Sequence, residues 1–150
     1  MIKKGISLVE VVIGVSLIAV SLIGLIGAYN FYFRIALKDT TFIQASFLLE
    51  EGLEVARLIR DDDWDSIANL TSGSFEYVND SWQSTTTPSS IDGFFYRTFV
   101  VSDVLRDSND DISLSGTEDP NIKEITVNVS WFDKNSTTTK SISTYLTKLF

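Results

Sequence analysis

The sequence predicts an α+β protein in which one long N-terminal α-helix, half membrane-spanning and half amphipathic, packs on a small antiparallel β-sheet head. Three observations predict this class. No charged residue occurs from Val11 to Ala28, apolar residues then recur at helical spacing as far as Ile59, and side chains alternate from Ile125 to Phe132. The first two patterns define the helix, and the third defines a strand with one buried face.

The uncharged stretch is long enough to cross a membrane. Its 18 residues span about 27 Å as a helix, close to the thickness of a bilayer core. A secretory signal peptide would have a shorter apolar region ending in a small-x-small cleavage site, and the residues up to Ile26-Gly27-Ala28 offer no good one. A plain signal anchor stays open, with Lys3 and Lys4 held in the cytoplasm by the positive-inside rule.

The helical pattern continues beyond this stretch. Spacings of three, four and seven residues place apolar or small side chains on one helix face: Ile35, Phe42, Ala45, Leu49, Gly52, Ala56 and Ile59. No proline occurs before Pro88, so we expect one helix from about residue 6 to about residue 60, on the order of 80 Å long. Acidic residues from Asp61 to Asp65 oppose a helix C-terminus and predict a solvated turn, with Trp64 covering the core edge.

Beyond residue 65 the period changes to that of strands. We expect strands at residues 75–78, 93–104, 125–132 and 139–150. Residues 81–90 are rich in serine and threonine and contain Pro88, so they are expected to form a surface loop. Residues 133–136 are expected to form the turn between the last two strands. The strands together predict one antiparallel sheet packed on the helix.

The residues before the apolar stretch carry a motif. Residues 3–10 read Lys-Lys-Gly-Ile-Ser-Leu-Val-Glu, so Glu10 lies five residues beyond Gly5, at the start of the membrane-length segment. A carboxylate in or beside the membrane is energetically costly, so its presence calls for a reason. A favourable interaction of Glu10 with the helix dipole is the simplest alternative to a specific role.

This segment resembles the prepilin signature of type IV pilins and type II secretion pseudopilins. The resemblance implies that a prepilin peptidase cuts between Gly5 and Ile6 and methylates the new amino terminus. It also implies that Glu10 helps each subunit to join a filament, and that Lys3 and Lys4 are the leader charge. Ile6 departs from the pattern, because phenylalanine is commoner after the cleaved glycine, and this lowers the expected efficiency of processing.

A second segment strengthens the resemblance. Residues 44–65 are similar to a pattern of PilV-like minor pilins, Ala-x-x-Leu-Ala-x-Glu-Gly-Ile-Glu followed by arginine and an Asp-Trp turn, with Leu49 in place of the second alanine. The implied organisation is a prepilin leader at residues 1–5, a transmembrane and filament-core helix half at 6–30, and an extracytoplasmic head domain at 31–150.

The implied function is structural. As a minor type IV pilin, the chain would cross the cytoplasmic membrane once with its C-terminal head outside, and would then enter or prime a pilus on the cell surface. Its implied partners are prepilin peptidase, other pilin subunits, the inner-membrane pilus assembly machinery and the membrane. Two alternatives stay open: a type II secretion pseudopilin, and a signal-anchored extracytoplasmic binding domain.

Composition restricts the other classes of function. The formal charge of −8 becomes −10 when Lys3 and Lys4 are removed with the leader, and an acidic surface makes direct nucleic-acid binding unexpected. The sequence contains no cysteine and no histidine, which excludes disulfides, thiolate metal sites and triad-type catalysis. Paired carboxylates alone are a weak indication of an enzyme, so we expect none.

One acidic segment is a candidate metal site. Asp107, Asn109 and Asp111 alternate, and Glu118 lies twelfth counting from Asp107, which echoes a calcium-binding EF-hand loop. Ile112 stands where that loop needs glycine, and no helices are expected on either side. Calcium at Asp107, Asn109, Asp111 and Glu118 is therefore one hypothesis, and a solvated acidic turn without any cofactor is the other.

Overall fold

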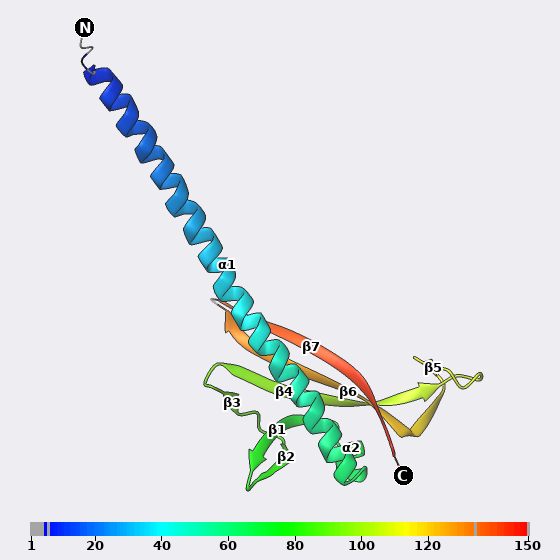
Figure 1. The fold of residues 1–150 in the computed structure, drawn as a ribbon. Helices are drawn as coiled ribbons and strands as arrows, with labels where there is room; N and C mark the ends of the chain where they lie inside the picture. Colours follow the sequence, from blue (N-terminus) through cyan, green and yellow to red (C-terminus); the bar gives the residue numbers. More distant parts are fainter. Residues whose placement is uncertain (1–4, 6, 134, 150) are drawn as a thin grey trace. The chain divides into compact units, whose positions relative to one another are not determined.

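The computed structural model describes residues 5, 7–133 and 135–149, and it confirms the α+β class (Figure 1). Helix α1 (Leu8–Asp62) is followed by a short helix α2 (Asp65–Ala68) and by strands that form one sheet. The strands are β1 (Ser72–Val78), β2 (Ser81–Thr85), β3 (Ser90–Ile91), β4 (Phe95–Arg106), β5 (Ile112–Ser113), β6 (Thr117–Asp133) and β7 (Ser136–Thr147). The chain divides into two units, Met1–Phe42 and Ile43–Phe150.

The described part of the first unit is the amino-terminal part of α1. Its large apolar side chains are exposed, as for Leu8 at 79% and Ile23 at 70%. Its polar side chains bond within the helix: the Ser16 and Ser21 hydroxyls donate to carbonyls four residues earlier, at 2.7 and 2.8 Å. Such local bonds satisfy polar groups where no water is available, whereas the exposed apolar side chains require lipid or other helices to cover them.

The second unit begins with the remaining part of α1, which packs on the sheet. The buried helix residues include Ala45, Leu49, Gly52 and Ala56, so the predicted apolar face is confirmed over this range. A Cβ atom added at Gly52 would lie 2.7 Å from Val127 Cγ1 of β6. This glycine therefore lets the helix backbone approach the sheet closely.

The sheet is antiparallel, with strand order β2-β1-β4-β6-β7, and β3 and β5 each pair with β4. The alternation predicted along the β6 segment is confirmed: Ile125, Val127, Val129 and Trp131 are buried against the helix side. The core continues onto β4, where the Phe99 ring stacks on Phe75 of β1 with a centroid distance of 4.3 Å.

The expected loop at residues 81–90 was wrong in part, because β2 occupies Ser81–Thr85 and β3 begins at Ser90; residues 86–89, which include Pro88, lie outside any strand. Asn79 and Asp80 have φ angles of 51° and 61°, so they form the left-handed two-residue turn that joins two strands into a tight hairpin. Residues 92 and 93 also have positive φ angles and form a turn, so β4 begins at Phe95 rather than at Gly93.

The β6 strand begins eight residues earlier than expected, at Thr117 instead of Ile125. The β4–β6 register shifts between Asp103 and Leu105, and Pro120 lies on β6 opposite this irregularity. Proline lacks the N–H group that regular pairing uses, so an irregular position accommodates it within a long strand. The last strand is Ser136–Thr147, and the predicted residue Phe150 lies outside the described residues.

The helix ends close to the predicted position. Asp61, Asp62 and Asp63 are exposed, as expected, and Trp64 is half-buried. The Asp63 carboxylate accepts hydrogen bonds from the Ser66 backbone N–H at 3.0 Å and from the Ser66 hydroxyl at 2.7 Å. The bond from the Ser66 hydroxyl is the main reason that the pKa of Asp63 lies below its ordinary value.

Candidate functional site at the amino-terminal end of the helix

Gly5 lies just before α1 and is exposed. The Ser7 carbonyl accepts hydrogen bonds from the N–H groups of Glu10 at 3.0 Å and Val11 at 3.2 Å, which starts the helix. A Cβ atom added at Gly5 would meet no atom within 4 Å. The described structure around Gly5 therefore places no steric demand for glycine. Ile6, Lys3 and Lys4, the other predicted processing and leader residues, lie outside the described residues.

Glu10 lies in the first turn of α1 and is exposed. Its spacing from Ser7 is that of a capping box, in which the glutamate side chain would bond back to the cap residue. Within the described residues, the Glu10 carboxylate has no hydrogen bond or ion pair. The position is favourable for a negative charge because of the helix dipole, yet the carboxylate keeps its capacity to accept bonds from a partner.

The segment that follows Glu10 is long and apolar enough to cross a membrane, and it lies near the N-terminus. None of the most apolar part of this helix is buried within the protein. An unburied apolar helix of this length is compatible with single-pass insertion. Glu10 would then lie at one end of the spanning segment, close to the interface between the bilayer and water.

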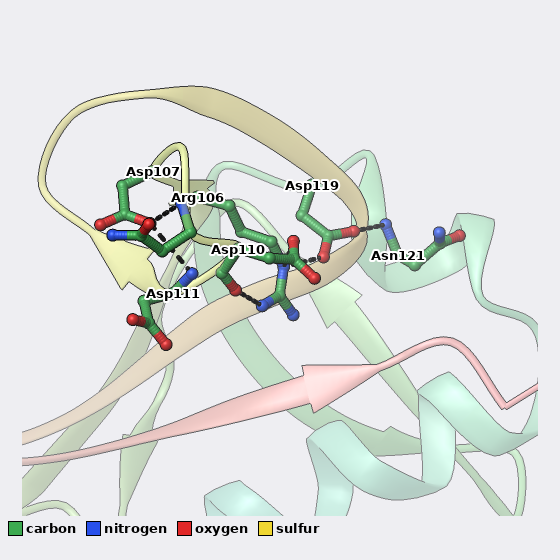
Figure 2. A network of polar contacts seen from close by, with 7 residues as sticks. Arg106, Asp107, Asp110, Asp111, Asp119 and Asn121 are labelled. Carbon is green, nitrogen blue, oxygen red and sulfur yellow. Dashed lines mark hydrogen bonds and ion pairs between the residues drawn. The ribbon is translucent and has the colours of Figure 1, made fainter.

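The predicted calcium ligands are not brought to one point. The Asp107 carboxylate accepts hydrogen bonds from the backbone N–H groups of Asn109 at 2.8 Å and Asp111 at 3.1 Å (Figure 2). Glu118 lies on β6 and accepts a hydrogen bond from the Lys123 ammonium at 2.9 Å, and the same ammonium pairs with Asp103.

Arg106 directly precedes Asp107 in the sequence, and its side chain lies among these acidic residues (Figure 2). Arg106 donates from Nε to Asp119 at 2.6 Å and from Nη1 to the Asp110 carbonyl at 2.6 Å (Figure 2). Among the described residues, no group of three or more acidic side chains is arranged to hold a metal ion. The calcium hypothesis stays a prediction, and the arrangement favours the alternative of an acidic turn tied by Arg106 and Lys123.

The Arg106–Asp119 pair predicts a pH dependence of stability. The hydrogen bond from Arg106 holds the pKa of Asp119 below its ordinary value of 3.8. The unfolded chain therefore binds this proton first as the pH falls, so the stabilisation is present above pH 3.8 and is lost as the pH falls through the lowered pKa of the folded protein. We expect Asp119→Asn to lower the melting temperature at about pH 7 and to change it much less at about pH 3. Melting curves that differ equally at both pH values would contradict this.

Sequence reasoning missed a buried cation. The Arg97 side chain on β4 is 3% exposed and pairs with Glu51 of α1 at 2.6 Å. Its guanidinium carbon lies 5.3 Å from the ring centroid of Trp82 on β2. The alternation of buried and exposed side chains along β4 could have indicated this burial, because Arg97 occupies an inward-facing position between Phe95 and Phe99.

Comparison with models of protein families, with curated proteins and with solved structures finds no match to this chain.

Proposed function

We propose that this chain is a minor type IV pilin, a structural subunit without enzymatic activity. Prepilin peptidase removes residues 1–5, and the mature protein spans the cytoplasmic membrane once with its head outside. The inner-membrane assembly machinery then moves it into an extracytoplasmic filament, where it contacts other pilin subunits. Glu10 is the assembly residue, Gly5 and Ile6 are the processing residues, and Lys3 and Lys4 hold the leader in the cytoplasm.

The observation that carries this proposal is the character of α1. The helix runs unbroken from Leu8 to Asp62, with exposed apolar side chains in the first unit and a face buried on the sheet in the second. A signal anchor needs only the first part, and a soluble domain needs only the second. A filament subunit uses both, because the apolar part packs first in lipid and then among neighbouring helices.

Two features of the amino-terminal segment add support. Gly5 is exposed just before α1, where an enzyme could reach the Gly5–Ile6 bond. Glu10 is exposed at the start of an apolar helix, where an acceptor is useful mainly to a partner from outside the chain. A type II secretion pseudopilin has the same requirements, and the two alternatives differ in the machinery that receives the subunit.

The first test is processing. In cells with an active prepilin peptidase, we expect the mature protein to begin at Ile6 with an N-methylated amino group, because cleavage follows Gly5. Mass spectrometry of the intact protein measures this directly. Gly5→Val should block cleavage, since the added side chain would crowd the peptidase site, whereas Gly24→Val on the exposed apolar helix should be cleaved normally.

The rival signal-anchored binding domain predicts a different outcome. Its amino terminus would stay at Met1 in the same cells, with or without the peptidase. Finding only the uncleaved form of the wild-type chain would therefore overturn the pilin proposal and leave the head as an anchored domain that works alone.

A further inference from the structure

The head contains a groove where its sheet splits. Strand β1 pairs with β4 only at Ser72 and Gly73, and beyond these positions it pairs with β2 instead. The amino-terminal end of β4 pairs with β3. The β1–β2 hairpin thus diverges from β4 and leaves a groove of about 430 Å³ beside Arg97. Its volume is comparable with that of small-molecule sites, but the groove is shallow and open to solvent, so a ligand there would stay partly exposed.

One wall of this groove, which we name the hairpin groove, is aromatic. Tyr77 of β1 and Trp82 of β2 are directly paired across the hairpin, and their rings meet edge to face with a centroid distance of 5.4 Å. Tyr77 is 59% exposed even though it is a large aromatic residue. Exposed aromatic rings provide flat apolar surfaces on which the C–H face of a ring-shaped ligand can stack.

The other lining residues provide both hydrogen-bond donors and acceptors. Arg97 lines the groove with its buried side chain, and its Nε has no hydrogen-bond partner among the described residues. Glu51, Glu76 and Ser89 also line it, and the Glu51 carboxylate stays half-exposed although it pairs with Arg97. A buried, unpartnered donor calls for an explanation in a native structure. Because this Nε has no accessible surface and Nη1 already donates to Glu51, the guanidinium contributes its positive charge to the groove, and the glutamates contribute acceptors.

The charges of the lining residues restrict the ligand. One arginine and two glutamates leave a net negative charge in an acidic protein, so an anion would be repelled. A cation would meet the positive charge of Arg97. A neutral molecule with many hydroxyl groups suits both kinds of charge, because each hydroxyl donates its hydrogen to a carboxylate and turns its oxygen toward the positive guanidinium.

We infer that the hairpin groove binds a neutral saccharide, with the sugar ring stacked on the Tyr77–Trp82 wall. Glu51 and Glu76 accept hydrogen bonds from its hydroxyl groups, and the positive charge of Arg97 lies beside its oxygens. The ligand would be one or a few sugar units of a glycan. This inference concerns the head alone and does not depend on the filament proposal.

The test uses the full chain in phosphocholine micelles, since detergents with sugar head groups would compete for the groove. Saturation-transfer NMR is recorded with a panel of glucose, galactose, mannose, N-acetylglucosamine and their disaccharides. We expect at least one neutral sugar to bind with a Kd of about 1 mM, because a small ligand makes few contacts. Acetate and glucuronate, the anionic probes, should bind less well than the neutral sugars.

Two variants locate the binding. Trp82→Ala should weaken it at least about tenfold by removing the stacking surface, and Tyr77→Ala, at an exposed position, should weaken it without disturbing the core. Trp64→Ala is the matched control, because Trp64 lies outside the hairpin groove. No binding by any sugar of the panel, equal binding by the wild type and Tyr77→Ala, or preferential binding of the anions would overturn the inference.

Discussion

Glu10→Gln should sharply reduce incorporation of the protein into filaments while leaving membrane insertion intact. In an assembled filament the amino group of Ile6 on a neighbouring subunit would pair with the Glu10 carboxylate, and both groups would be surrounded by apolar helices. Removing one partner of such a buried pair leaves an uncompensated charge and typically destabilises by about 3–5 kcal/mol. Glutamine keeps the shape of the side chain, so the variant isolates the electrostatic contribution.

The measurement is the ratio of filament-bound to membrane-bound protein in sheared cell fractions. Insertion should be unchanged or better, since one charge fewer enters the lipid, and cleavage after Gly5 should persist. Glu50→Gln is the matched control, because it removes an exposed carboxylate from the same helix outside the apolar segment. Equal incorporation of Glu10→Gln and wild type would show that Glu10 has no assembly role in this subunit.

The second large effect is expected at Gly52, where the helix meets the sheet. A side chain there would approach Val127 Cγ1 to 2.7 Å and Arg97 Cδ to 3.1 Å, so these atoms would have to move. Overpacking of this kind typically destabilises a core by about 1–3 kcal/mol, more than the few tenths gained when valine replaces glycine in a helix. We therefore expect Gly52→Val to lower the free energy of unfolding of the head, as measured by urea denaturation.

A double-mutant cycle distinguishes a local clash from a general defect. Val127→Ala removes the methyl groups that the new side chain would approach, and by itself it leaves a small cavity. The double variant should be more stable than the sum of the two single effects predicts, because each change relieves the other. Gly24→Val, where an added Cβ meets no atom within 4 Å, should leave the unfolding of the head unchanged. Additive effects at positions 52 and 127 would contradict the packing account.

The sequence alone determined the features that depend on local periodicity. The uncharged run from Val11 to Ala28, the helical spacing up to Ala56 and the alternation from Ile125 to Trp131 each specify an element and its buried face. These patterns predicted the α+β class, the long helix and the main strands. The Gly5–Glu10 motif was likewise visible, because its meaning depends on spacing along the chain.

The tertiary structure alone decided which distant residues meet. A strand was expected at residues 75–78, within β1, but its partner β2 was hidden by a serine- and threonine-rich composition, since exposed edge strands need little apolar alternation. Glu118 resembled a calcium ligand in sequence, but the strand register sets it beside Lys123. Arg97, Glu51 and Trp82 come from three separate elements, and their contact follows from how the helix and the hairpin pack around β4. Periodicity specifies the buried face of an element, whereas strand pairing and helix packing specify the neighbours of that face.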